Sequence, residues 1–520
     1  MRTVLIVLLA APAFAADLSA ITVIGGLVRG VSLEKGGAVF KGIPFAQAPV
    51  GDLRWREPAP GKAWSGVRET NSFGAPCAQN SGGKMQENSS EDCLFLNVWS
   101  PEWPARGRKP VMVWFHGGGN YAGTASGNNF DGEKLARRGV VLVTANYRLT
   151  VFGFFAHPEL TKESPRHASG NYGLMDQIAA LKWVRDNIAQ FGGDPANVTI
   201  FGQSAGAVDV NVLMTSPQAQ GLFHKVIAES GTVTRVPDDA TMRMTGLGAV
   251  MSPRTGDTYS DALTLAEAEK AGQQLMPGSL KQLRALPAAD LLKATAAPRM
   301  SIGPANGIIV DGWIFPKPPA QVFAQGAQQR IPLLLGNNSR ERTPPQVTPE
   351  DLTAAMQAMY GPLASRAFSL YSITAPADPL YGGMPAQWVV DTMYRCPVVV
   401  QLNWHVAAGN PAYEYQFDRA SPGREAAGAT HGAEVGYVFG NLGANYAQAD
   451  RDLSDAIQQY WTNFAKTGDP NGGGLPKWPK FDTTARGYIE FTDSGAASHE
   501  GLRRPFCDLY VDNIKRLMSR

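Results

Sequence analysis

One serine in this sequence lies in the setting that nucleophilic catalysis requires. Residues 202–206 read Gly-Gln-Ser-Ala-Gly; they directly follow the apolar run 198–201 and lead into a helical segment. A strand, a sharp turn and a helix around G-x-S-x-G make a nucleophile elbow, in which a strained turn projects the serine hydroxyl from the sheet edge. We therefore expect Ser204 to be the nucleophile of an acyl transfer. A glycine-rich turn without chemistry is the alternative.

A triple-glycine loop upstream of the elbow is typical of an oxyanion hole. Residues 116–119 read His-Gly-Gly-Gly and follow the apolar run 111–115. A loop without side chains in this position lets backbone N–H groups approach the carbonyl oxygen of a substrate. We expect the donors to be Gly118, Gly119 and Ala205. By itself, Gly-Gly-Gly would indicate only a flexible loop.

A general base is needed to take the serine proton, and seven histidines compete for this role. His431 stands out because residues 428–434 read Gly-Ala-Thr-His-Gly-Ala-Glu late in the chain, where a fold with this elbow places its histidine. Only neutral imidazole accepts a proton, so activity should rise as the pH passes about 6.5. We interpret the other histidines as structural or solvated: His116, His157, His167, His224, His405 and His499.

The segments that must position these residues alternate between strands and helices. The strand candidates are nearly continuous apolar runs, as expected for parallel strands buried on both faces, and a helix pattern with one apolar stripe lies between two of them. This alternation predicts an α/β fold with a large, mostly parallel central sheet flanked by helices, and function at the carboxyl ends of the strands. The expected strands are 111–115, 140–145, 198–201, 226–228 and 331–335, and the expected helices are 171–190 and 453–465.

Length and composition are those of a soluble globular protein. The 520 residues are 44% hydrophobic and 18% charged, which are ordinary values. Large α/β folds grow by insertions, so we expect a single domain over 16–520, with a variable insertion or cap at about 232–330, where periodicity weakens. A net charge of +2 without a basic block argues against nucleic acid as a partner. The sequence does not fix the oligomeric state.

The first fifteen residues have the three parts of a signal peptide. Arg2 supplies the positive charge, residues 4–11 form a short apolar run, and residues 13–15 read Ala-Phe-Ala. We expect cleavage after Ala15, with an uncleaved amphipathic N-terminus as the alternative. No later stretch approaches 18 consecutive apolar residues, so we expect no membrane span and a secreted or periplasmic protein.

Two stretches of this sequence resemble the type-B carboxylesterase and cholinesterase family of α/β-hydrolases. Residues 191–206 look like the serine signature of that family, and residues 91–98, Glu-Asp-Cys-Leu-Phe-Leu-Asn-Val, look like its second signature. The resemblance covers most of the chain apart from 232–330. It implies an α/β-hydrolase fold with cap or insertion regions, and hydrolysis of carboxylic esters through an acyl-enzyme. Shorter matches occur at 40–46, 146–148 and 229–231.

Four cysteines in an exported chain are naturally interpreted as two disulfides, although four buried thiols are the alternative. Three pairings are possible, and the resemblance implies Cys77–Cys93 and Cys396–Cys507. No cysteine or histidine cluster has zinc spacing, so we predict no metal site. No organic cofactor is implied.

The acid of the expected Ser, His and acid triad is identified by the family resemblance and by its position after a strand. After the apolar run 331–335, residues 336–341 read Gly-Asn-Asn-Ser-Arg-Glu, and the family places a glutamate at this offset. We therefore expect Glu341 to orient His431, in the order Ser, Glu, His. The family's Asp-Glu-Gly here reads Arg340-Glu341-Arg342; the arginines could pair with Glu341 and weaken its hold on His431, or point to solvent. Glu434 is the reserve.

Two features bear on the substrate. The loop 78–92 contains no aromatic residue, whereas cholinesterases use a tryptophan there as a cation–π platform, so choline esters are not expected. Gln203 replaces a glutamate that family members often carry, which favours a neutral or acidic substrate. We expect short-chain aryl or alkyl esters. The alternatives are a lipase, a hydrolase of aromatic or polymer esters, and a non-catalytic binding protein on the same fold.

Overall fold

The predicted apolar runs pair into one central sheet. The computed structural model describes residues 18–81, 84–236, 241, 258–260, 262–295, 307–343 and 347–520. The expected signal peptide and its cleavage after Ala15 lie outside the described residues. Among the helices within these ranges, none is long and apolar enough to cross a membrane.

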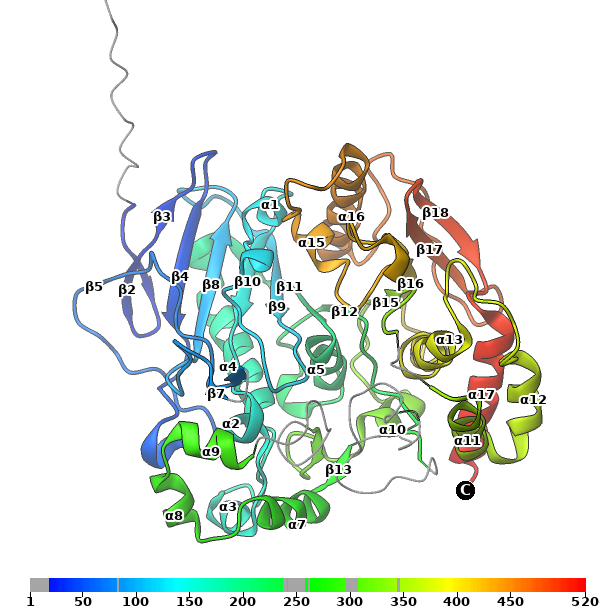
Figure 1. Cartoon of the computed structure of the whole chain (residues 1–520). Coiled ribbons are helices and arrows are strands. Elements are labelled where there is room, and N and C mark those ends of the chain that lie inside the picture. The colour runs from blue at the N-terminus through cyan, green and yellow to red at the C-terminus, as the bar shows by residue number, and fades with distance from the viewer. Residues whose placement is uncertain are drawn as a thin grey trace, which may run out of the picture.

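The sheet has eleven strands and a parallel centre (Figure 1). Every neighbouring pair in the centre is parallel, and both edges are antiparallel. This arrangement confirms the predicted mostly parallel sheet. The parallel strands, in spatial order, are β10 (Val141–Ala145), β9 (Lys109–Phe115), β11 (Gly193–Gln203), β12 (Lys225–Glu229), β15 (Leu333–Asn338), β16 (Ala412–Phe417) and β17 (Gly487–Thr492); the edges are β8 (Phe95–Ser100), β4 (Ala38–Pro44), β3 (Val31–Ser32) and, at the other end, β18 (Gly495–Glu500).

The central strands are buried on both faces, which explains their continuous apolar runs. In β9, Val111, Val113 and Phe115 belong to the core on one face, whereas Met112 and Trp114 belong to the core on the other. The expected strand 331–335 begins two residues later and continues to Asn338. Its polar end remains in the sheet because Asn337 and Asn338 stay in register with β16.

Helices cover both faces of the sheet. The expected helix 171–190 is α4 (Tyr172–Asn187) followed by a 3₁₀ turn, and Gly192 ends it in the left-handed region. The prediction of a single apolar stripe is wrong, because α4 is buried on almost every side. Asp176 is buried and forms an ion pair with Arg148 at 2.8 Å. The expected helix 453–465 is the centre of α16 (Gln448–Thr467).

The insertion expected at about 232–330 contains short helices in its described part. The guanidinium of Arg54 donates to the carbonyls of Arg284 and Leu286, which ties this region to the body of the protein. Its helices α7 to α9 lie together below the N-terminal half of the sheet in Figure 1. Its elements are α7 (Leu265–Leu275), α8 (Leu280–Ala285), α9 (Ala288–Ala294), α10 (Pro319–Ala324) and the paired strands β13 (Leu263–Thr264) and β14 (Ile309–Val310).

A group of helices from the C-terminal third packs beside β15 to β17 (Figure 1). One continuous helical stretch runs through α13 (Met384–Val390), a π-helical turn (Asp391–Arg395) and α14 (Cys396–Ala407). Disulfides Cys77–Cys93 and Cys396–Cys507 are both present, as the resemblance implies, and the second joins α14 to α17 (Arg504–Met518). The remaining elements are β1 (Ile21–Val23), β2 (Gly26–Arg29), β5 (Val67–Glu69), β6 (Asn80–Ser81), β7 (Lys84–Met85), α1 (Glu133–Ala136), α2 (Thr150–Phe154), α3 (Pro158–Glu163), α11 (Pro349–Tyr360), α12 (Ala364–Leu370) and α15 (Val435–Phe439).

Candidate active site

Ser204 lies at a sharp turn between β11 and α5 (Ala205–Leu213). Its φ is 58° and its ψ is −121°, a conformation that is strained for a residue with a side chain. Its backbone N–H donates to the Glu229 carbonyl at 2.8 Å, which holds the turn against β12. A Cβ at Gly206 would lie 2.1 Å from the Phe115 carbonyl oxygen, so this position has no room for a side chain. The turn therefore has the geometry of a nucleophile elbow.

The imidazole of His431 is held by Glu341. Their Nδ1 and Oε2 atoms are 2.6 Å apart, and the backbone N–H of His431 donates to the Glu341 carbonyl at 3.0 Å. The second carboxylate oxygen accepts from the Asn338 N–H at 2.7 Å. Glu341 is only 1% exposed, so its carboxylate is fixed by these contacts rather than by water. This bond keeps the proton on Nδ1 and leaves Nε2 as the proton acceptor.

The acceptor nitrogen faces the end of β11. His431 Nε2 is 3.3 Å from Gln203 Nε2, the side-chain amide of the residue before Ser204. With Nδ1 protonated, the Gln203 amide donates to Nε2. In this structure no hydrogen bond joins Ser204 and His431, both of which are described. Hydrogen bonds of this kind are often long without substrate and shorten when it binds.

Two further buried glutamates, Glu229 and Glu434, have raised pKa values. Burial raises the pKa of Glu229 to about 8, and its Oε1 accepts from Trp461 Nε1 at 2.8 Å. Burial and the charges of Glu341 and Glu229 raise the pKa of Glu434, whose Oε2 accepts from the Asn338 amide. Glu434, the reserve for the acid, makes no hydrogen bond to His431 among the contacts of the described residues. Glu341 is the carboxylate that contacts the histidine.

The triple-glycine loop lies against the elbow. Gly118 and Gly119 have φ of 109° and 64°, in the left-handed region that favours glycine. A Cβ at Gly117 would lie 3.0 Å from the Cβ of Ser204, so the loop and the nucleophile are in close contact. Ala205, the first residue of α5, carries one of the N–H groups that have no acceptor within a helix.

His116 supports this loop from inside the protein. Its ring stacks on Tyr147 with centroids 4.5 Å apart, and the Tyr147 hydroxyl donates to the His116 carbonyl at 2.7 Å. Burial lowers the pKa of His116 to about 4, so the ring is neutral at physiological pH. This agrees with the structural role expected for it.

The two arginines beside the acid follow neither alternative expected from the sequence. Arg340 donates to backbone carbonyls, including those of Leu380 at 2.8 Å and Ala426 at 2.9 Å. Arg342 donates through Nε to the Tyr394 hydroxyl at 2.9 Å. Neither forms an ion pair with Glu341 in the described structure. Both therefore leave the bond between Glu341 and His431 intact.

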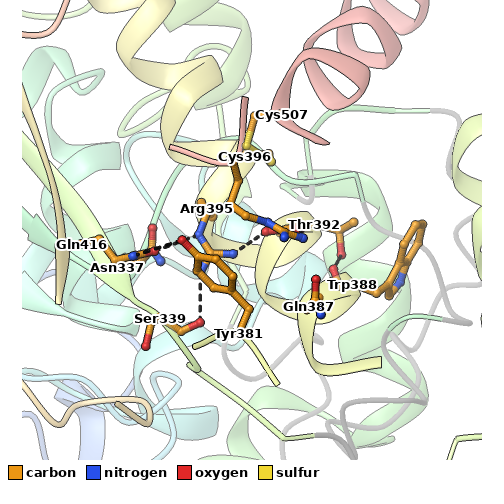
Figure 2. A network of polar contacts seen from close by, with 12 residues as sticks. Asn337, Ser339, Tyr381, Gln387, Trp388, Thr392, Arg395, Cys396, Gln416 and Cys507 are labelled. Atoms are coloured by element: carbon orange, nitrogen blue, oxygen red, sulfur yellow. Dashed lines mark hydrogen bonds and ion pairs between the residues drawn. A yellow bond between two sulfur atoms is a disulfide. The ribbon is translucent and has the colours of Figure 1, made fainter. Parts of the chain in front are cut away.

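Tyr394 and Arg395 belong to the site, although no motif pointed to them. Both lie on the π-helical turn, a feature found frequently at functional sites. The Tyr394 ring lies 5.5 Å from the His431 ring, centroid to centroid. Arg395 is completely buried and donates to the Ser339 carbonyl at 2.9 Å, close to the acid. Figure 2 shows its guanidinium beside Ser339 and against the ring of Tyr381, 4.7 Å from the centroid.

Among the residues that the structure describes, no group of three or more His, Cys, Asp or Glu residues could hold a metal ion.

Known proteins are similar to this chain in sequence and in architecture. A family model described as the Carboxylesterase family matches residues 17–358 and 384–510. Fumonisin B1 esterase of Sphingopyxis macrogoltabida is 36% identical over 501 residues, covering 92% of this chain and 87% of that protein. Carboxylesterase 1D of Rattus norvegicus is 35% identical over 506 residues, covering 89% of this chain and 86% of that protein. A solved PNB esterase has a TM-score of 0.77 and 33% identity, covering 94% of this chain and 99% of that one.

Proposed function

The chain belongs to the carboxylesterase family, has the α/β-hydrolase fold and is a carboxylic ester hydrolase; from this premise we propose that it works through an acyl-enzyme formed on Ser204. His431 is the general base and Glu341 the acid that orients it. The observation that carries this proposal is the 2.6 Å bond between Glu341 and His431, with the other imidazole nitrogen facing the end of the strand that leads to Ser204.

The proposed reaction has two matched halves. Ser204 Oγ attacks the ester carbonyl carbon while His431 Nε2 takes its proton, and Glu341 stabilises the imidazolium. The N–H groups of Gly118, Gly119 and Ala205 stabilise the tetrahedral oxyanion. Collapse breaks the bond to the alcohol, which leaves with the proton from His431. A water molecule then attacks the acyl-enzyme with the same proton transfers and releases the carboxylic acid.

We also propose that the protein is exported, by cleavage after Ala15, to the periplasm or the exterior. Two disulfides support this, because such bonds persist in oxidising compartments. Fractionation of the native host should recover the esterase outside the cytoplasm, with a mature N-terminus at Ala16 by Edman sequencing. Full-length protein in the cytoplasm would refute export.

Hydrolysis of p-nitrophenyl acetate and butyrate tests the esterase mechanism. Wild-type protein should turn both over, and Ser204→Ala should abolish turnover while circular dichroism shows an unchanged fold. Mass spectrometry should find an acyl group on Ser204 after a brief reaction. Equal turnover by wild type and Ser204→Ala would contradict the proposal. A jump in rate on emulsified long-chain esters would instead indicate a lipase, and binding without turnover the non-catalytic alternative.

A further inference from the structure

The residue after the acid places a positive charge beside the proposed site. Arg342 is partly buried, and its Nε donates to the Tyr394 hydroxyl at 2.9 Å. The same tyrosine also lies beside the proposed base, because the Tyr394 and His431 ring centroids are 5.5 Å apart. Only one aromatic side chain therefore separates the guanidinium from His431.

The same guanidinium interacts electrostatically with Tyr121, a tyrosine that follows the triple-glycine loop. A Cβ at Gly119 would lie 2.3 Å from the ring of Tyr121, so this tyrosine packs directly on that loop. Burial lowers the pKa of Arg342, but the neighbouring hydroxyls of Tyr394 and Tyr121 and the carboxylate of Glu341 together raise it. Arg342 is thus charged, and its charge interacts with residues next to the proposed base, the acid and the triple-glycine loop.

Among the described residues, no carboxylate lies within ion-pair distance of Arg342. Glu341 uses one oxygen for the Asn338 N–H and the other for His431 Nδ1. Within the described part of the chain, Arg342 forms no ion pair, and its only hydrogen bond is the one through Nε. Its two terminal nitrogens remain as donors in the fork that matches a carboxylate. Neither terminal nitrogen is a fully buried atom without a partner, so both are open to solvent and to an anion that displaces it.

The neighbouring polar residue is consistent with an anion. Gln203, whose amide faces His431, is neutral where a glutamate would repel a negative substrate. Arg340, by contrast, is occupied by backbone carbonyls and offers nothing to a ligand. Arg342 is therefore the arginine of this segment that is equipped for recognition.

We propose that Arg342 binds a carboxylate carried by the ester substrate, so that the enzyme prefers anionic esters such as monoesters of dicarboxylic acids. The inference rests on the proposed esterase function and adds its substrate class. Arg342 determines specificity and takes no part in the proton transfers. Tyr394 positions it by accepting from Nε, which leaves the two terminal nitrogens available as donors.

Two pairs of esters of similar size test this. For the acyl side we would compare mono-4-nitrophenyl adipate with 4-nitrophenyl hexanoate, and for the alcohol side 3-carboxyphenyl acetate with 3-methylphenyl acetate, subtracting uncatalysed hydrolysis. In Arg342→Gln, the ratio of kcat/KM for the anionic ester to that for the neutral ester should fall roughly tenfold to a hundredfold in at least one pair. Arg342→Lys should retain part of the ratio, because it keeps the charge without the fork.

A surface arginine provides the matched control. Arg185 on α4 is half exposed and pairs with Asp186, and Arg185→Gln removes the same charge without changing either ratio. In the wild type, raising the salt concentration should lower kcat/KM for the anionic ester more than for the neutral one, a measurement that needs no variant.

The outcomes separate the two proposals. If Arg342→Gln leaves both ratios unchanged, or if anionic and neutral esters lose activity equally, Arg342 acts on Glu341 or the fold and the inference is wrong. If the wild type hydrolyses neither class, the esterase mechanism itself fails and the inference fails with it. Hydrolysis of neutral esters without any effect of Arg342→Gln on the ratios refutes the inference alone.

Discussion

Glu341→Gln should nearly abolish turnover, whereas Glu434→Gln should leave most of it. Both glutamates are buried and accept a hydrogen bond from Asn338, and each substitution replaces a carboxylate by an amide of the same shape. They differ in what the carboxylate contacts. Glu341 accepts from the protonated Nδ1 of His431, whereas Glu434 accepts from the Asn338 side-chain amide and makes no hydrogen bond to His431 among the described residues.

The magnitude follows from the two bonds of Glu341. Its Oε1 accepts from a buried backbone N–H at 2.7 Å, so a glutamine at this position must direct its amide oxygen there and its NH₂ group at His431. In the opposite orientation, the NH₂ group of the glutamine would face the Asn338 N–H, and two donors facing each other cost about 1–3 kcal/mol. His431 Nδ1 must then accept, and the proton moves to Nε2, where it blocks transfer from Ser204. An analogous tautomer switch costs about 10⁴ in kcat, or roughly 5.5 kcal/mol.

Steady-state kinetics on p-nitrophenyl butyrate at pH 7.5 would measure both variants beside the wild type. We expect kcat for Glu341→Gln to fall about 10⁴-fold with little change in KM, and kcat for Glu434→Gln to stay within about fivefold. Thermal melts would verify that both variants fold. Retention of a tenth of the wild-type kcat by Glu341→Gln, or equal losses in both variants, would refute the assignment of Glu341.

Three further predictions concern other parts of the structure. Gly117→Ala places a methyl group 3.0 Å from the Cβ of Ser204, so kcat/KM for p-nitrophenyl butyrate should fall about a hundredfold without loss of helix content by circular dichroism; an unchanged rate would mean that the loop moves freely. Replacing both Cys396 and Cys507 by serine opens a loop of sequence separation 111 and should lower the free energy of unfolding by about 4–5 kcal/mol in urea titrations; an unchanged midpoint would contradict this. Burial raises the pKa of Glu414 from 4.5 to about 8, so its contribution to stability is fully present below pH 4.5 and is lost as the pH rises to about 8. Tm should decline across that window, less so in Glu414→Gln, and an equal decline in both proteins would show that another group is responsible.

The sequence was sufficient for the sheet and the elbow because these depend on local patterns. The run 111–115 is apolar throughout because its alternate residues pack into two different hydrophobic clusters, one on each face of the sheet. The glycine at 206 marked the elbow because a side chain there would meet the Phe115 carbonyl. The expected ends of strands were less accurate, since Asn338 is polar yet stays in the ladder with β16.

The surroundings of the acid could not be predicted from the sequence. The family resemblance indicated Glu341, but the residues alone did not exclude Glu434. The structure distinguishes them, because Asn338 binds Glu341 through its backbone and Glu434 through its side chain, and Glu341 is the one that contacts His431. Tyr394 had no motif, since its position depends on the extra residue that a π-helical turn contains. Nothing in the sequence therefore indicated that Arg342 contacts Tyr394.

The support behind His431 sets the order in which the site is completed during synthesis. Arg503 binds Asp391 of the π-helical turn at 2.7 Å, and Cys507 is bonded to Cys396 directly after that turn. Both residues come about 70 positions after His431 in the chain. A ribosome that has just added the histidine has therefore made the proposed nucleophile, acid and base, but not the residues that hold their neighbours in place. Under the proposed export, the cysteines would oxidise after the chain has crossed the membrane, so these supporting contacts would be completed only there.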